Sequence, residues 1–128
     1  MSVIGVDHGT KRCGIAIEIA GVAFPKDIVP TGLVLHALHK LVAEYGTKLI
    51  VIGKAPHLDG KRSRQQGIQE DFVTVLGREF PECQIVMSPE GFSSKQARYE
   101  LEAAGLPSDG QIDDQAAAII LQDYLDKN

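Results

Sequence analysis

A short apolar run at residues 49–52, closed by Gly53, constrains the fold of this chain more than any other feature. Four consecutive apolar residues that end at a glycine are typical of a strand buried on both faces, as in the parallel sheets of α/β proteins. Apolar residues at helical spacing precede the run (Val34, Leu38, Leu41, Val42 and Tyr45) and follow it (Ile68, Phe72, Val75 and Leu76). We therefore expect a central parallel strand with helical, right-handed crossovers.

Three further strands are predicted before this unit. Residues 2–7 and 12–19 are rich in apolar β-formers and are separated by a turn-forming run. Pro25 interrupts a third strand at 22–29, which indicates an edge position or a bulge. Residues 84–87 make a fifth strand. Helices are expected from Thr31 to Gly46, up to about Phe80, from Ser93 or Ser94, and over 113–125.

The order of these elements predicts an α/β fold in three layers. A mixed five-stranded sheet, whose first three strands form an antiparallel meander, is flanked by helices. The chain has 128 residues, slightly fewer than the roughly 150 of a typical domain. We expect a single domain over residues 1–128.

Charge is divided unevenly along the chain. The net charge is -4, yet residues 1–64 hold nine Lys or Arg against five Asp or Glu, and residues 65–128 hold four against twelve. In the first half, one loop holds four cations and a single acid, Asp59. The cations are Lys54, Lys61, Arg62 and Arg64. Such a patch can attract a polyanion, although a solvated loop explains it equally well. With no Trp and 5% aromatic residues, recognition of nucleic-acid shape and backbone is favoured over base stacking.

The cellular setting is predicted from what the sequence lacks. No apolar run approaches the ~20 residues that cross a bilayer, and Asp7 interrupts the N-terminus where a signal peptide needs apolar residues. We expect a cytoplasmic protein with no membrane partner. Cys13 and Cys83 are expected to be reduced thiols, which are too few for a cysteine-based metal site.

Acidic residues are predicted to meet at the carboxyl ends of the strands, where α/β folds bind ligands. Asp7 closes the first strand, Glu90 follows the fifth, and Asp113 and Asp114 open the last helix. Each alone suits a turn, a loop or a helix cap. Together they would repel one another unless a hard cation with oxygen ligands, such as Mg²⁺, neutralised them. Two such ions roughly 4 Å apart are the arrangement used for phosphodiester cleavage.

Four ordered motifs resemble the YqgF family, also called RuvX. They are residues 4–16 (IGVDHGTKRCGIA), residues 51–56 (VIGKAP) continuing to Asp59-Gly60, residues 93–97 (SSKQA) continuing to Leu101, and the helix from Ile112-Asp113 to Tyr124-Leu125. The resemblance implies a ribonuclease H-like fold and a Mg²⁺- or Mn²⁺-dependent hydrolase that matures the 5′ end of pre-16S rRNA in the small ribosomal subunit. Asp7, Glu90 and Asp113 would then be catalytic, metal-binding acids, with Asp114 ranked second as a ligand.

One departure from the family pattern keeps alternatives open. The family has an Asp-Glu-Arg run where this chain reads Pro89-Glu90-Gly91, so the arginine that could hold a phosphate is absent. The alternatives are a Holliday junction resolvase on branched DNA, which would normally need a homodimer rather than a monomer, and a ribosome-assembly or nucleic-acid binding module with idle acids. An actin-like ATPase would need a second domain.

Several residues near these motifs have two interpretations. Lys11 and Arg12 follow the Asp7 turn and are candidate phosphate contacts, together with Lys54, Lys61, Arg62 and Arg64. His8 and His57 could support the site, but a neutral histidine prefers softer ions than Mg²⁺, and packing or solvent exposure is the simpler role. Gly9 is interpreted as a backbone requirement of the turn.

Overall fold

The computed structural model describes residues 2–9, 11–54, 64–89 and 111–127, and at 54, 64–66, 89 and 111–115 it describes the backbone alone. The strands are β1 (Val3–His8), β2 (Arg12–Ile19), β3 (Val22–Pro30), β4 (Leu49–Lys54) and β5 (Gln84–Pro89). The helices are a 3₁₀ turn η1 (Thr31–Leu33), α1 (Val34–Tyr45), α2 (Arg64–Glu79) and α4 (Gln111–Lys127).

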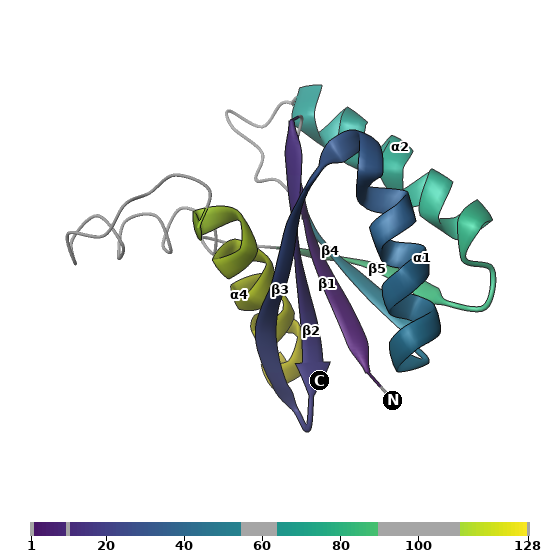
Figure 1. The fold of residues 1–128 in the computed structure, drawn as a ribbon. Coiled ribbons are helices and arrows are strands. Elements are labelled where there is room, and N and C mark those ends of the chain that lie inside the picture. The colour runs from purple at the N-terminus through teal and green to yellow at the C-terminus, as the bar shows by residue number, and fades with distance from the viewer. Residues whose placement is uncertain (1, 10, 55–63, 90–110, 128) are drawn as a thin grey trace, which may run out of the picture.

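The strands of these ranges form one mixed sheet in the order β3-β2-β1-β4-β5. β1, β2 and β3 are an antiparallel meander, whereas β1, β4 and β5 run parallel. Helices α1 and α2 cover one face and α4 covers the other (Figure 1). The predicted three-layer arrangement and five-stranded sheet are confirmed.

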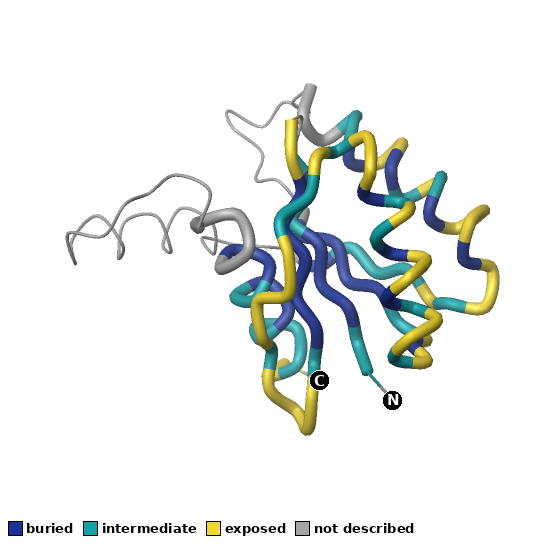
Figure 2. Tube along the Cα trace, in the orientation of Figure 1, coloured by how far each residue is buried: buried dark blue, intermediate teal, exposed yellow. Residues whose placement is uncertain are grey.

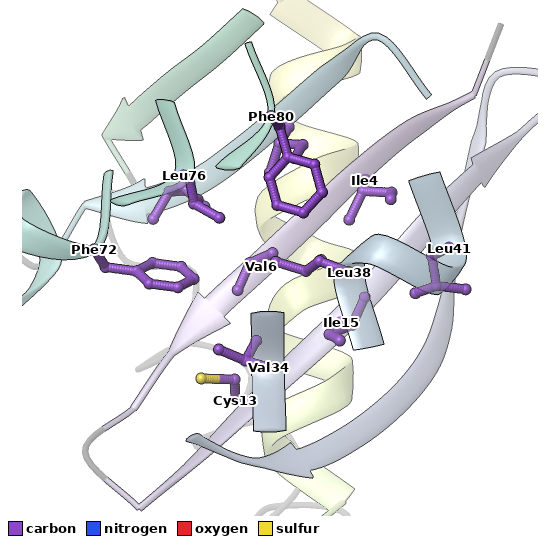
Figure 3. Packing of buried hydrophobic residues seen from close by; sticks show 12 residues of the cluster. Ile4, Val6, Cys13, Ile15, Val34, Leu38, Leu41, Phe72, Leu76 and Phe80 are labelled. Carbon is purple, nitrogen blue, oxygen red and sulfur yellow. The ribbon is translucent and has the colours of Figure 1, made fainter. Parts of the chain in front are cut away.

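The central strands are buried on both faces (Figure 2), as the apolar run predicts. In β4, Ile50 and Ile52 join the core under α1 and α2, while Val51 joins the core under α4. In β1, Ile4 and Val6 face α1 and α2, whose large apolar side chains surround them (Figure 3). Because neighbouring residues of a strand point to opposite faces, the residues between them face α4.

The meander ends in an edge strand with a bulge, as Pro25 predicts. Ile15 pairs with Asp27 and the next residue, Ala16, pairs with Pro25, which leaves Lys26 as an extra residue. The proline has no N–H to give to a ladder, so this irregular edge position is compatible with it. The hairpin before it turns on Ala20 and Gly21, whose φ values are 54° and 85°, as a tight two-residue turn requires.

The predicted helix at 31–46 begins later than expected. Residues 31–33 form the 3₁₀ turn, and the α-helix spans Val34–Tyr45 and is capped by Gly46, whose φ is 63°. The difference arises because Thr31 bonds the turn between β1 and β2, through its N–H to Lys11 O at 3.0 Å and its hydroxyl to Gly9 O at 2.8 Å. β4 and α4 extend two residues beyond their predicted ends, to Lys54 and Lys127.

Other expectations have mixed outcomes. Cys13 and Cys83 are both reduced thiols, as predicted. The helix expected from Ser93 or Ser94 lies outside the described residues. Among the helices that are described, none is both long and apolar enough to cross a membrane.

Candidate functional site

The carboxyl ends of three parallel strands form one edge of the sheet. Across β1, β4 and β5, Val6 pairs with Ile52, Gly53 with Ser88, and Lys54 with Pro89. Asp7 therefore lies beside the end of β4. Glu90 directly follows Pro89 in the sequence and itself lies outside the described residues. This is the edge at which the sequence predicts the acids to meet.

Asp7 is on the face of the sheet that carries α4. Two residues earlier in β1, a Cβ added to Gly5 would lie 2.7 Å from Leu121 Cβ and 3.2 Å from Ala117 O. Because residues i and i+2 of a strand share a face, Asp7 lies on the α4 side, at the end of the strand. Its side chain is half-buried.

His8 points the opposite way. Its ring stacks on Phe72 of α2, with centroids 4.2 Å apart and planes 26° from parallel, and only 6% of its surface is exposed. Burial lowers the pKa of the His8 imidazole below its ordinary value, which favours the neutral ring. The packing role is confirmed, and Asp7 and His8 do not share a face of the sheet.

The direction of α4 brings its first turn to the same edge. Near the end of the helix, the side chain of Gln122 accepts a hydrogen bond from the backbone N–H of Ala23. Ala23 pairs with Glu18 of β2, and Glu18 lies beside the first residue of β1. Figure 1 shows the last turns of α4 at that end and its first turn at the other. α4 is thus antiparallel to β1, and its contact with Gly5 lies between the two ends of the helix.

This geometry places positions 7 and 113 at the same level. Asp113 precedes Ala117 by one helical turn, about 6 Å along the axis. Asp7 lies two residues beyond Gly5, about 7 Å along β1 in the same direction. Position 113 shares a helix face with Ala117 and Ile120, which pack on the sheet, and position 114 shares one with Leu121.

Gly9 and Thr31 hold the turn that follows Asp7. A Cβ at Gly9 would lie 2.4 Å from Arg12 O, so the turn between the two strands requires glycine, as predicted. The Thr31 hydroxyl lies 2.8 Å from Gly9 O and 3.6 Å from Cys13 Sγ. Sequence reasoning missed Thr31, because no local pattern indicates a bond across 22 residues. It also missed Gly5, although a glycine inside a strand is a known sign of close approach.

The predicted cations divide into two groups. Lys11 and Arg12 are exposed beside the Asp7 turn. Lys54 ends β4 and Arg64 begins α2, with only their backbones described, and Lys61, Arg62 and His57 lie outside the described residues. Within the described part of the chain, no three His, Cys, Asp or Glu side chains form a group able to hold a metal. Of the four predicted acids, Asp7 alone has a described side chain.

Comparison with known proteins finds relatives that match nearly the whole length of this chain and share one name. A protein of Flavobacterium johnsoniae is 30% identical over 96% of this chain and 94% of its own, and one of Chlorobaculum tepidum is 32% identical over 98% and 94%. Both carry the provisional name pre-16S rRNA nuclease. Among solved structures, Thermus thermophilus RuvC in complex with a Holliday junction substrate aligns with a TM-score of 0.62 at 15% identity, covering 100% of this chain and 96% of RuvC.

The family comparison agrees with both results. The family described as "RuvX: Holliday junction resolvase" matches residues 1–127. The likeness to RuvC at low identity establishes the ribonuclease H-like fold, and the resemblance found in the motifs is confirmed. The chain belongs to the RuvX family of nucleases.

Proposed function

We propose that this chain is a divalent-metal-dependent endonuclease that hydrolyses phosphodiester bonds in structured RNA, at the 5′ end of pre-16S rRNA. Asp7, Glu90 and Asp113 are the catalytic acids in this proposal, and Asp114 is an additional ligand. The family match and the names of the relatives support the reaction class. The pre-ribosomal small subunit is then the partner, and the protein works in the cytoplasm.

The observation that carries the proposal is the common level of Asp7 and position 113. The close contact of Gly5 with Leu121 and the reversed direction of α4 bring the end of β1 and the start of the helix to one edge. Glu90 follows β5, which ends two strands from β1 at the same edge. Capping and turn preferences explain each carboxylate alone, but they give no reason for carboxylates from three distant parts of the chain to share one edge.

The donor set fits a hard cation. The proposed ligands are carboxylates, which suit Mg²⁺ or Mn²⁺, and His8 is turned to the other face against Phe72. Asp7, Glu90 and Asp113 would hold the ion. When bound, such an ion activates water and stabilises the negative charge that develops on phosphate oxygens. Lys54, Lys61, Arg62 and Arg64 would hold the flanking phosphates of the substrate.

The test compares cleavage with binding for an RNA fragment that contains the 5′ end of 16S rRNA and its leader. The wild-type chain should cut it with Mg²⁺ or Mn²⁺ and not with a chelator. Asp7→Asn and Asp113→Asn should abolish cleavage and weaken Mn²⁺ binding, measured by calorimetry, while RNA affinity stays. Asp71→Asn, on the exposed side of α2, is the matched control and should leave cleavage, Mn²⁺ binding and RNA affinity unchanged.

Two other results would overturn the proposal in different ways. If the wild-type chain binds the RNA and never cuts it under either metal, the binding-module alternative holds, and the missing arginine at Gly91 gives its reason. If the RNA resists cleavage while a four-way DNA junction is cut symmetrically, the substrate is the junction. Sedimentation of that complex then decides between a monomer and the homodimer that paired cuts require.

A further inference from the structure

Two hollows flank the edge strand β3, and they differ in charge. The first has a volume of about 490 Å³ and is lined by Lys11, Arg12, Ile28, Val29 and Pro30. The second, of about 190 Å³, is lined by Lys26, Asp27, Ala37, Lys40, Leu41 and Glu44. Each has two cations. Among the described lining residues, the second hollow also has two carboxylates, Asp27 and Glu44, and the five described residues of the first include none.

The first hollow lies next to the end of β1. Asp7 pairs with Gly14, and Arg12 is two residues further toward the same edge, where it pairs with Pro30. From strand spacing and rise, the Cα atoms of Asp7 and Arg12 are about 8 Å apart. Arginine and lysine side chains reach several Å beyond their Cα atoms, so these cations can contact phosphates within a few nucleotides of a bond held at Asp7. Lys54 ends β4 on the other side of β1.

The backbone under the two cations is fixed. Thr31 bonds Lys11 O through its N–H and Gly9 O through its hydroxyl, and Gly9 allows the close approach of Arg12 O. The side chains of Lys11 and Arg12 are exposed, while Ile28 and Val29 are half-buried and form an uncharged floor. A site whose cations start from a fixed backbone loses less entropy when it binds.

We propose that Lys11, Arg12 and residues 28–30 of β3 form a phosphate-binding subsite for the nucleic-acid backbone, within a few nucleotides of the scissile bond. The inference rests on the proposed function, because the ligand is identified as nucleic acid from the nuclease site proposed beside the hollow. The guanidinium of Arg12 can bind a phosphate with two parallel hydrogen bonds, and Lys11 adds a second positive charge. The substrate thus lies across the sheet edge, with phosphate contacts on both sides of β1.

The experiment measures RNA binding as a function of salt. Lys11→Gln/Arg12→Gln is compared with Lys26→Gln/Lys40→Gln, which removes the same charge from the second hollow. Both pairs are made in the Asp7→Asn chain and measured without divalent metal on a base-paired RNA fragment. Each phosphate contact contributes about 0.9 to the slope of log affinity against log salt. We expect the first pair to lower that slope by about two and the second to leave it within about half a unit of the parent.

The outcome separates this inference from the proposed function. Equal slopes for the two pairs, or no change in the first, would overturn the subsite even if the wild-type chain cuts RNA. If Lys11→Gln/Arg12→Gln lowers the salt slope as expected but the wild-type chain never cuts RNA, the subsite is supported and the proposed nuclease is overturned. Thermal unfolding of each variant, with the single variants Lys11→Gln and Arg12→Gln measured alongside, verifies that a lower slope comes from a folded protein.

Discussion

The side-chain oxygen of Gln122 accepts the backbone N–H of Ala23 at 2.9 Å, so the last helix occupies a donor on the edge strand β3. The amide nitrogen of Gln122 is itself held by Asp126 Oδ1 at 3.0 Å. Along the same strand, the N–H of Ile28 bonds Asp27 Oδ1 at 2.8 Å, and Pro25 has no N–H. Edge strands with free donors recruit other strands, and these positions of β3 are protected against such pairing.

Gln122→Ala should expose the Ala23 donor and increase self-association. We expect a loss of about 1 kcal/mol in the free energy of unfolding, the typical value of one hydrogen bond, and a larger mass by light scattering at high concentration. Asp126→Ala removes only the partner of the Gln122 amide and should have a smaller effect on both. A Gln122→Ala protein that matches the parent in mass and stability would show that β3 is protected by other means.

The two thiols should react at very different rates. Burial and the nearby Glu82 raise the pKa of Cys83, against a smaller lowering by Lys48, and its Sγ donates to Thr47 O at 3.3 Å. A raised thiol pKa means less thiolate at each pH below it, so alkylation should be slower than for a free cysteine and should accelerate as the pH rises past 9. Cys13 is fully buried. Mass spectrometry of the alkylated native protein should find label on Cys83, and the Cys83→Ala chain should stay unlabelled until it unfolds.

Thr31→Val should loosen the turn after Asp7. The change keeps the side-chain shape and removes the hydroxyl that donates to Gly9 O, at a cost of about 1–3 kcal/mol because a part-buried acceptor loses its partner. RNA cleavage should fall with stability. Thr74→Val is the matched control, since the Thr74 hydroxyl bonds Glu70 O on the exposed side of α2 and Val and Thr have similar helix propensities. Equal melting temperatures for the two variants would contradict the role of Thr31.

The sequence predicts most of the sheet because its signals are local. The apolar run at 49–52 specifies a strand that contributes to both cores, Pro25 marks the bulged edge, and Gly46 adopts the left-handed conformation that ends α1. Each of these depends on the chemistry of a few neighbouring residues. The five-stranded order then follows from short connections and right-handed crossovers.

The site depends on contacts that no local pattern contains. The level of Asp7 relative to α4 is set by the bond between Ala23 and Gln122, 99 residues apart, and by the contact of Gly5 with Leu121. Sequence reasoning grouped Asp7, Glu90 and Asp113 from topology alone. It had no means to determine which face Asp7 occupies, because a shift of one residue in strand register moves every side chain to the other face.

Gly5→Ala tests whether the contact of β1 with α4 positions the acids. The added Cβ would lie 2.7 Å from Leu121 Cβ and 3.2 Å from Ala117 O. No side-chain rotation moves a Cβ, so α4 must shift away from the sheet. We expect a loss of about 1–3 kcal/mol in the free energy of unfolding, as for other overpacked cores, and weaker Mn²⁺ binding and RNA cleavage because Asp113 moves with the helix.

The matched control for this change is Gly77→Ala, in α2. A Cβ there meets no atom within 4 Å, and alanine favours a helix over glycine by up to about 1 kcal/mol, so this variant should be slightly more stable and equally active. Measurements at 15 °C, far below unfolding, separate positioning from stability, because a protein that is folded but has lost Mn²⁺ affinity must have a displaced ligand. If Gly5→Ala is destabilised yet binds Mn²⁺ and cuts RNA like the parent, α4 contributes packing and Asp113 is not a ligand.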